Sequence, residues 1–180
     1  MPLQSGDAAP DFNLPNANAP VGGERVSLTD AAGANGTLVL FECNHCPYVV
    51  ASVDRINAMA TSCLSKGIGF VGINSNDPVV YPNDSFEHMV KRAASGMPYA
   101  YLHDASQEIA HAYGAKRTPE FFLFNAADQL VYQGRMDDSP RNPNDVTSND
   151  LADAIDAMLG GQKPPVDYTE SIGCSVKWKA

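Results

Sequence analysis

The stretch Thr37-Leu-Val-Leu-Phe-Glu-Cys-Asn-His-Cys-Pro-Tyr48 joins an apolar run to two cysteines separated by two residues. The run 37–41 has the length of a buried β-strand, and from Tyr48 onward apolar side chains recur at helical spacing. We therefore expect Cys43 and Cys46 to lie where a strand ends and a helix begins. The first turn of a helix presents unpaired N–H groups and a partial positive charge, which stabilise a thiolate. Because the thiolate is the attacking species in thiol–disulfide exchange, this position predicts a redox-active dithiol.

The length and charge of the chain limit its domain count and its partners. At 180 residues it is long enough for one full core, and we expect a single domain over residues 1–180. The formal net charge of -9 argues against a nucleic acid or an anionic membrane surface as partner. Residues 1–7 have neither the basic nor the apolar part of a signal peptide, and no later stretch has the length of a membrane span. We expect a cytoplasmic protein, although a periplasmic form with a trimmed signal peptide would look the same.

The four cysteines, Cys43, Cys46, Cys63 and Cys174, form one close pair and two isolated residues. A disulfide framework is typical of short secreted chains with a higher cysteine density, so we do not expect one. A zinc site built on Cys43, His45 and Cys46 would need a second closely spaced ligand pair, which the sequence lacks. We expect neither a metal nor another cofactor. Cys63 falls on the apolar face of the predicted helix, which predicts a buried structural thiol.

Periodicity and turn residues divide the rest of the chain into alternating strands and helices. Residues 1–36 predict an extended arm with a short strand at 25–28, and residues 162–180 predict an irregular C-terminal tail. Further strands are predicted over 37–42, 68–73, 98–102, 119–124 and 129–134, and helices over 48–66, 85–94, 106–113 and 151–159. This alternation, which ends in a hairpin and a helix, implies an α/β fold with a mixed sheet and helices on both of its faces.

The order of these elements resembles the thioredoxin fold: a strand, Cys-x-x-Cys, a long helix, a strand, a helix, Thr118-Pro119, a hairpin and a terminal helix. Segment 6–14, Gly-x-x-Ala-Pro-Asp-Phe-x-Leu, resembles the start of the peroxiredoxin and thiol-specific antioxidant branch. Four segments are similar to the peroxiredoxin-like thioredoxin-family proteins, namely 43–49, 72–77, 118–124 and 171–178. The resemblance implies a thioredoxin fold, with a mixed central β-sheet flanked by helices and a peroxiredoxin-like N-terminal extension.

The residues of the Cys-x-x-Cys segment receive individual roles. Cys43 is predicted to be the nucleophile, with its sulfur exposed at the helix start, and Cys46, one turn in, is predicted to resolve the mixed disulfide. Asn44 and His45 occupy the variable pair, which in the thioredoxin fold tunes the reduction potential. His45 either gives a positive charge or hydrogen bond to Cys43 or is an exposed turn residue. Glu42 either raises the pKa of the neighbouring thiol or points away and accepts a proton from Cys46.

Other candidate residues lie far from the pair in sequence. The thioredoxin fold carries a cis-proline that faces the active disulfide, so the resemblance implies a cis Thr118–Pro119 bond and a Thr118 backbone free to pair with substrate. Arg117 either approaches the pair, where its charge would favour a thiolate, or is a solvated loop residue. Family members often have a cysteine at this position, so any function of that thiol is in doubt here. Cys174 is predicted to be a structural thiol, with a third redox thiol as the alternative.

These residues favour a thiol:disulfide oxidoreductase that exchanges with protein or small-molecule disulfides and is restored by an unidentified thiol reductant. The first alternative is a thiol peroxidase of the peroxiredoxin-like antioxidant type, with Cys46 or Cys43 as peroxidatic residue and peroxide as substrate. Against it, Cys43 stands where peroxiredoxins have a threonine three residues before the peroxidatic cysteine. The second alternative is a non-catalytic binding module, because a fold does not determine a function.

Overall fold

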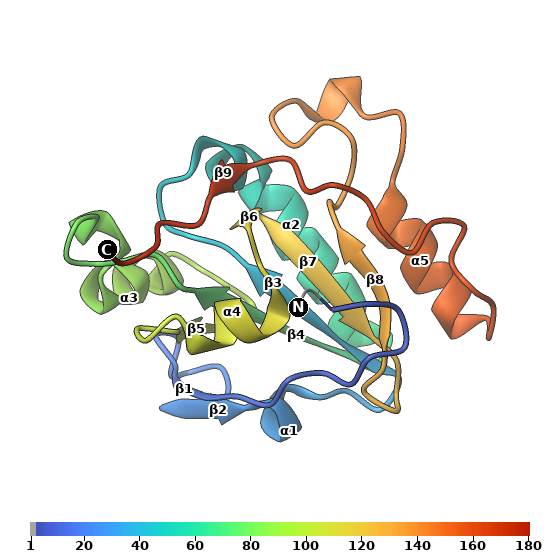
Figure 1. The fold of residues 1–180 in the computed structure, drawn as a ribbon, viewed down its shortest axis with the longest axis horizontal. Helices are drawn as coiled ribbons and strands as arrows, with labels where there is room; N and C mark the ends of the chain where they lie inside the picture. Colours follow the sequence, from blue (N-terminus) through green and yellow to red (C-terminus); the bar gives the residue numbers. More distant parts are fainter. Residues whose placement is uncertain (1–2) are drawn as a thin grey trace.

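The computed structural model describes residues 3–180, and its central sheet has five strands in the order β5-β4-β3-β7-β8 (Figure 1). The strands are β3 (Gly36–Phe41), β4 (Ile68–Asn74), β5 (Ala100–His103), β7 (Glu120–Phe124) and β8 (Leu130–Gly134). Strand β4 runs parallel to β3 and β5, whereas β7 runs antiparallel to β3 and β8. The predicted mixed sheet with its closing hairpin is therefore confirmed.

Helices cover both faces of this sheet, as predicted. They are α1 (Leu28–Ala31), α2 (Pro47–Ser65), α3 (Phe86–Ala94), α4 (Glu108–Tyr113) and α5 (Asp150–Leu159). One apolar core joins α2, α3 and α5 to one face, and a second joins the N-terminal arm, α1 and α4 to the other. Leu38 and Leu40 of β3 belong to the first core, and Val39 and Phe41 belong to the second. The apolar run of β3 is unbroken because both of its faces are buried.

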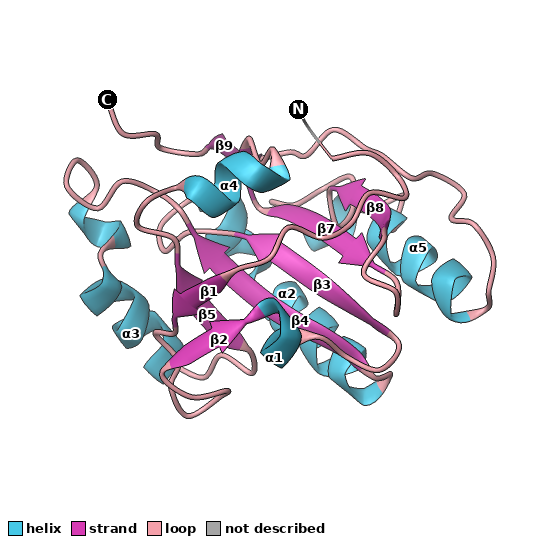
Figure 2. Ribbon diagram, turned by 60° about the horizontal axis from the view of Figure 1, so that its bottom comes forward, coloured by secondary structure: helices cyan, strands magenta, loops and turns pink. Residues whose placement is uncertain are grey.

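The N-terminal arm forms a hairpin of β1 (Asn13–Pro15) and β2 (Arg25–Ser27), which Figure 2 shows in front of the sheet together with α1. The strand predicted at 25–28 is confirmed except for Leu28, which begins α1 instead. The Ser27 hydroxyl accepts a hydrogen bond from the Asp30 backbone N–H at 3.1 Å, and the Asp30 carboxylate accepts one from the Ser27 N–H at 3.0 Å. This reciprocal capping starts the helix that the strand prediction missed.

The C-terminal tail, which was predicted to be irregular, contains the short strand β9 (Cys174–Ser175). It pairs antiparallel with β6 (Arg117–Thr118), so that Thr118 lies opposite Cys174. In Figure 1 the tail leaves α5 and crosses over β6 beside the start of α2. The side-chain amide of Gln107 donates to the Lys177 carbonyl at 2.9 Å and accepts from the Lys179 N–H at 3.0 Å. The tail is therefore attached to the body of the domain at β9 and again beyond it.

The loops contain two single-turn 3-10 helices, η1 (Pro82–Asp84) and η2 (Pro143–Asp145). The first lies between β4 and α3 and carries a fully buried aspartate, Asp84. Within residues 3–180, none of the helices combines the length and the apolar character that a bilayer crossing requires.

Candidate active site

Cys43 and Cys46 lie between β3 and α2, at the strand-to-helix junction that the sequence predicts. Cys46 is the N-cap of α2, and Pro47 takes the first helical position, where a missing N–H removes no helical hydrogen bond. Both cysteines are free thiols, and Cys43 is 2% exposed and Cys46 3% exposed. The prediction that the Cys43 sulfur is exposed is therefore wrong, because other segments of the chain cover the junction.

Thr118 contacts both sulfurs. Its Oγ1 lies 3.6 Å from Cys43 Sγ, and its carbonyl oxygen lies 3.4 Å from Cys46 Sγ. The register of β7 against β3 places Glu120 opposite Phe41, which brings Thr118 to the end of β3 and so to the dithiol. The Thr118–Pro119 bond is cis, as the resemblance implied. The implied free edge at Thr118 is absent, because β9 pairs with it.

A hydrogen bond between the two sulfurs separates their pKa values. The Cys43 thiol donates to Cys46, which lowers the pKa of Cys46 to about 4 in spite of burial, with help from Cys174 and the Val49 N–H. The same hydrogen bond raises the pKa of Cys43, and burial and the charge of Asp84 raise it further. At neutral pH the pair therefore holds one proton on Cys43 and one negative charge on Cys46, at the N-terminus of α2.

Glu42 is fully buried beside the dithiol and is neutralised by a cation from α3. Its Oε1 lies 2.5 Å from Arg92 Nη2, and the Tyr99 hydroxyl donates to its Oε2 at 2.7 Å. Arg92 also donates to the Cys43 carbonyl oxygen at 3.0 Å. A buried carboxylate needs such partners, because removing its charge from water is costly. Both partners of the Glu42 carboxylate are residues other than Cys46. The role of Glu42 as proton acceptor for Cys46 therefore stays a prediction.

Asp84 is a second fully buried carboxylate at the site, and the two residues between the cysteines bind it. It accepts hydrogen bonds from the Asn44 backbone N–H at 2.8 Å and from the side-chain amides of Asn74 at 3.1 Å and Asn76 at 2.9 Å. His45 Nδ1 lies 3.3 Å from its Oδ2, and the His45 side chain is 40% exposed. The structure therefore directs His45 to Asp84 rather than to the Cys43 sulfur.

The sequence analysis did not identify Asp84, Arg92 or Tyr101 as part of this site. The Tyr101 hydroxyl donates to the Asn44 side-chain oxygen at 2.7 Å, and the Arg92 guanidinium lies 5.0 Å from the centre of the Tyr101 ring. Their sequence signals are weak, because an acid in a polar loop and a base in the last turn of a helix are usually solvated. Only the packing of η1, α3 and β5 around residues 42–46 brings them together.

The remaining candidates divide between the surface, the core and the dithiol. Arg117 is half-exposed and lies 3.9 Å from Glu170, so its charge is paired at the surface. Cys63 is 1% exposed in the core, as predicted, and burial raises its pKa to about 11. Cys174 lies opposite Thr118 in the β6–β9 pair, and its side chain packs against the core that contains Cys43 and Cys46. Whether it is a structural or a third redox thiol stays a prediction.

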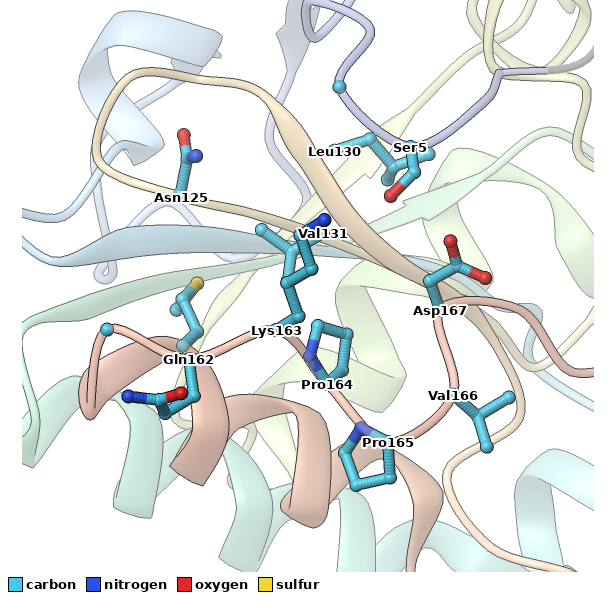
Figure 3. A pocket seen from close by; sticks show the side chains of 13 residues that line it. Ser5, Asn125, Leu130, Val131, Gln162, Lys163, Pro164, Pro165, Val166 and Asp167 are labelled. Carbon is cyan, nitrogen blue, oxygen red and sulfur yellow. The ribbon is translucent and has the colours of Figure 1, made fainter.

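A cavity of about 940 Å³ lies away from the dithiol, between the N-terminal arm, the β7–β8 hairpin, α5 and the tail (Figure 3). Its lining includes Ser5, Asn125, Lys163 and Asp167 and none of the four cysteines. In the described part of the chain, no group of three or more His, Cys, Asp or Glu side chains is arranged to hold a metal ion. The dithiol is therefore the site to which the chemistry is assigned.

The chain is similar to a known protein family and to several solved structures. The profile of the Redoxin family matches residues 4–155. An uncharacterized conserved protein from Geobacillus kaustophilus is 42% identical with a TM-score of 0.90, over 98% of this chain and 93% of that chain. A hypothetical protein from Sinorhizobium meliloti 1021 is 38% identical with a TM-score of 0.90, over 100% of this chain and 97% of that chain.

A third solved structure is described as a thiol:disulfide interchange protein DsbE, an assignment given there as provisional, from Chlorobium tepidum. It is 25% identical with a TM-score of 0.65, over 88% of this chain and 99% of that chain. The search of curated proteins found no significant match to the chain. The similarity therefore extends over almost the whole chain, and the proteins from Geobacillus kaustophilus and Sinorhizobium meliloti 1021 carry no assigned activity.

Proposed function

Since the chain belongs to the Redoxin family of thiol-based redox proteins and has the thioredoxin-like fold, we propose that it is a thiol:disulfide oxidoreductase. Its substrates are disulfides of proteins or small molecules, and its working groups are Cys43 and Cys46. One observation carries the proposal: two free thiols lie at the N-terminus of α2, and Thr118 contacts both, with its Oγ1 3.6 Å from Cys43 Sγ and its carbonyl oxygen 3.4 Å from Cys46 Sγ. The lowered pKa of Cys46 supports it, because a pair that holds one thiolate at neutral pH is ready for exchange. The similarity to the Chlorobium protein supports disulfides as substrates.

In the first step Cys43 attacks one sulfur of the substrate disulfide while Cys46 takes its proton. A bond forms between Cys43 and that sulfur, the substrate S–S bond breaks, and the second substrate sulfur leaves as a thiolate. The Thr118 carbonyl oxygen, 3.4 Å from Cys46 Sγ, then accepts a hydrogen bond from the protonated Cys46. The Thr118 hydroxyl, 3.6 Å from Cys43 Sγ, is placed to donate to that sulfur as it loses its proton.

In the second step the mixed disulfide is resolved within the pair. The leaving thiolate takes the proton from Cys46, and the Cys46 thiolate attacks Cys43, releasing the other substrate sulfur. The dithiol is oxidised to a Cys43–Cys46 disulfide, and the substrate disulfide is reduced to one thiol and one thiolate. A thiol reductant returns the pair to its starting state. Cys43 is placed first in this order because it precedes the start of α2, whereas Cys46 is the N-cap of that helix.

The order of attack is tested by trapping. Cys46→Ser, mixed with oxidised insulin or a small aromatic disulfide, should accumulate a mixed disulfide on Cys43, and Cys43→Ser should lose reductase activity. The adduct is measured by intact mass and the activity by insulin turbidity, with Cys63→Ala as the control because that thiol lies in the core. An adduct in Cys43→Ser and none in Cys46→Ser would reverse the order. No adduct in either variant, with no activity in the unmodified protein, contradicts the function.

A thiol peroxidase is the second candidate, and the negative charge on Cys46 at the helix N-terminus favours it. There the Cys46 thiolate attacks a peroxide oxygen, the O–O bond breaks, the second oxygen leaves as hydroxide or alkoxide, and Cys46 becomes a sulfenic acid. Cys43 then displaces water from it to form the Cys43–Cys46 disulfide. Peroxide consumption that Cys46→Ser abolishes and Cys43→Ser retains selects this candidate. A redox titration without a reversible Cys43–Cys46 couple instead selects a non-catalytic binding module.

A further inference from the structure

We propose that Cys174 is a third redox thiol, which attacks Cys46 of the oxidised pair and carries the disulfide from the buried site to strand β9. The inference rests on the proposed function, because it starts from the Cys43–Cys46 disulfide. It assigns a reaction to the C-terminal tail, which lies beyond the segment that the family profile matches.

The backbone of the tail is held directly against the residue that contacts both sulfurs. Strand β9 places Cys174 opposite Thr118, and the Val176 N–H donates to the Lys116 carbonyl at 2.9 Å. A Cβ atom at Gly173 would overlap the carbonyl group of Thr118, so a glycine at this position allows the close approach. Three sulfurs are therefore gathered around Thr118.

Cys174 lies on the Cys46 side of the pair. Strand β9 pairs it with Thr118, whose backbone carbonyl oxygen lies 3.4 Å from Cys46 Sγ, and its side chain packs against the core that contains Cys43 and Cys46. In agreement with this placement, Cys174 lowers the pKa of Cys46. A thiol placed this near Cys46 needs little movement to attack it, because proximity replaces a bimolecular encounter. Cys46 is therefore the sulfur of the oxidised pair at which exchange takes place.

The three thiols differ in burial, so the exchange moves the disulfide from the interior toward the surface. Cys43 and Cys46 are 2% and 3% exposed, whereas Cys174 is only half-buried and is followed by an exposed Ser175. An external reductant reaches a disulfide between two buried sulfurs less readily than one that includes a surface residue. A Cys46–Cys174 disulfide includes a residue of the surface strand, so it brings the oxidised state closer to solvent.

Oxidation of the pair itself activates Cys174. In the reduced protein burial, the hydrogen bond to Cys46 and the negative charge of Cys46 raise the pKa of Cys174 to about 11. Once Cys46 is part of a disulfide, it has no charge and no longer accepts a strong hydrogen bond from the thiol. Burial then still raises the pKa of Cys174, and the positive charges of Lys177 and Arg141 lower it. Cys174 is therefore less ionised while the pair is reduced and more ionised once it is oxidised.

The exchange step is balanced without a further reactant. The Cys174 thiolate attacks Cys46 Sγ, the Cys46–Cys174 bond forms, and the Cys43–Cys46 bond breaks. Cys43 leaves as a thiolate 3.6 Å from the Thr118 hydroxyl and takes up the proton that Cys174 lost. One disulfide replaces another, so nothing is oxidised or reduced overall.

Peptide mapping of the full-length protein tests the proposal, because trypsin separates the thiols. Cys43 and Cys46 fall in residues 26–55, Cys63 falls in residues 56–66, and Cys174 falls in residues 142–177. A Cys43–Cys46 disulfide is thus internal to one peptide, whereas a Cys46–Cys174 disulfide links two. The protein is oxidised with diamide, its free thiols are alkylated with iodoacetamide, and the digest is analysed by mass spectrometry without reduction.

In Cys43→Ser, which keeps Cys46 and Cys174, we expect the cross-link between residues 26–55 and 142–177 to be the main oxidised product. The double variant Cys43→Ser/Cys174→Ser should lose it, and Cys63→Ala should behave as the unmodified protein does. Cys43→Ala is a second variant with the same expectation, and circular dichroism verifies the fold of each. In the unmodified protein the cross-link should appear after the internal disulfide when the reaction is quenched at successive times.

The outcomes separate this inference from the proposed function. Absence of the cross-link in folded Cys43→Ser and Cys43→Ala, with an internal disulfide in the unmodified protein, overturns the role of Cys174 and leaves the function standing. Absence of both the internal disulfide and the cross-link from the unmodified protein at every time overturns both. A Cys174 cross-link found only between two copies of the chain, seen as a dimer on a non-reducing gel, overturns the exchange within one molecule.

Discussion

Two buried carboxylates flank the dithiol, and different groups stabilise their charges. Glu42 comes directly before Cys43 and is bound by the guanidinium of Arg92 at 2.5 Å. Asp84 comes from η1, after the next strand of the chain, and is bound by three N–H groups of asparagines and by His45 Nδ1 at 3.3 Å. A permanent cation cancels the first charge, whereas amide donors stabilise the second without cancelling it.

The difference affects the pKa of Cys43. The charge of Asp84 is one of the main causes that raise the pKa of Cys43, after the hydrogen bond to Cys46 and burial, and Glu42 is not among them. The carboxylate that is adjacent in sequence therefore has less influence on the thiol than the one that folding brings near. Proximity along the chain does not measure electrostatic influence, because the nearest counter-charge decides it.

Breaking the Glu42–Arg92 pair should have the largest effect. Arg92→Met leaves Glu42 buried without its cation, and we expect the free energy of unfolding of the reduced protein to fall by about 3–5 kcal/mol. Urea denaturation measures the loss. The double variant Arg92→Met/Glu42→Gln removes both charges and should recover much of it. A loss below about 1 kcal/mol in the single variant would show that the pair does not hold Glu42 in place.

The hydrogen bond between the sulfurs should have the next largest effect, and it should change the thiol pKa values more than either carboxylate does. Cys43→Ala removes the donor, so we expect the pKa of Cys46 to rise from about 4 by more than about one unit, as measured by the thiolate absorbance near 240 nm. Cys63→Ala is the control, because burial raises the pKa of that thiol to about 11. An unchanged titration in Cys43→Ala would assign the lowered pKa to the helix terminus and Cys174 instead.

The same lowered pKa predicts how the stability of the reduced protein depends on pH. The folded-state pKa of Cys46, about 4, lies below its ordinary value of 9.0, so ionisation of Cys46 favours the folded state. This contribution is fully present above pH 9.0, decreases as the pH falls, and is lost below about pH 4. Urea midpoints of the unmodified protein and Cys46→Ser, compared across this range, should converge at the acidic end. A constant difference between them would contradict the prediction.

Neutralising Asp84 should have a smaller effect. Asp84→Asn keeps the shape of the side chain and removes its charge, so we expect the pKa of Cys43 to fall by up to about one unit. The pH dependence of iodoacetamide alkylation measures it, in a Cys46→Ser background that leaves Cys43 as the reacting thiol of the pair. The matched control is Glu42→Gln/Arg92→Met, which removes a pair that is already neutral. A larger fall in that control than in Asp84→Asn would reverse the comparison.

The contact between His45 and Asp84 should matter least. The His45 side chain is 40% exposed, so solvent and salt screen its interaction with the carboxylate. We expect His45→Ala to lower the free energy of unfolding by less than about 1 kcal/mol, and by still less at high salt. A loss above about 2 kcal/mol that salt does not reduce would show that Asp84 depends on a charged partner, as Glu42 does.

Much of the fold could be predicted because strand and helix patterns are properties of successive residues. The buried run of β3, the apolar spacing of α2 and the turn residues of the β7–β8 hairpin each follow from local sequence. Strand β9 could not be predicted, since its two residues are a strand only through their pairing with β6. The burial of Cys43 was missed for the same reason, because the segments that cover it come from elsewhere in the chain.

The sequence by itself determined the dithiol and its place between a strand and a helix, because a local pattern contains both. It also predicted the burial of Cys63 from helical spacing, but it left the place of Cys174 open, since an isolated cysteine carries no information on its distance from another. Only the tertiary structure placed Cys174 opposite Thr118, against the core that contains Cys46. It also brought Asp84 and Arg92 to the site, where their charges act in opposite ways. Burial and electrostatic interactions depend on distance in space, which folding alone establishes.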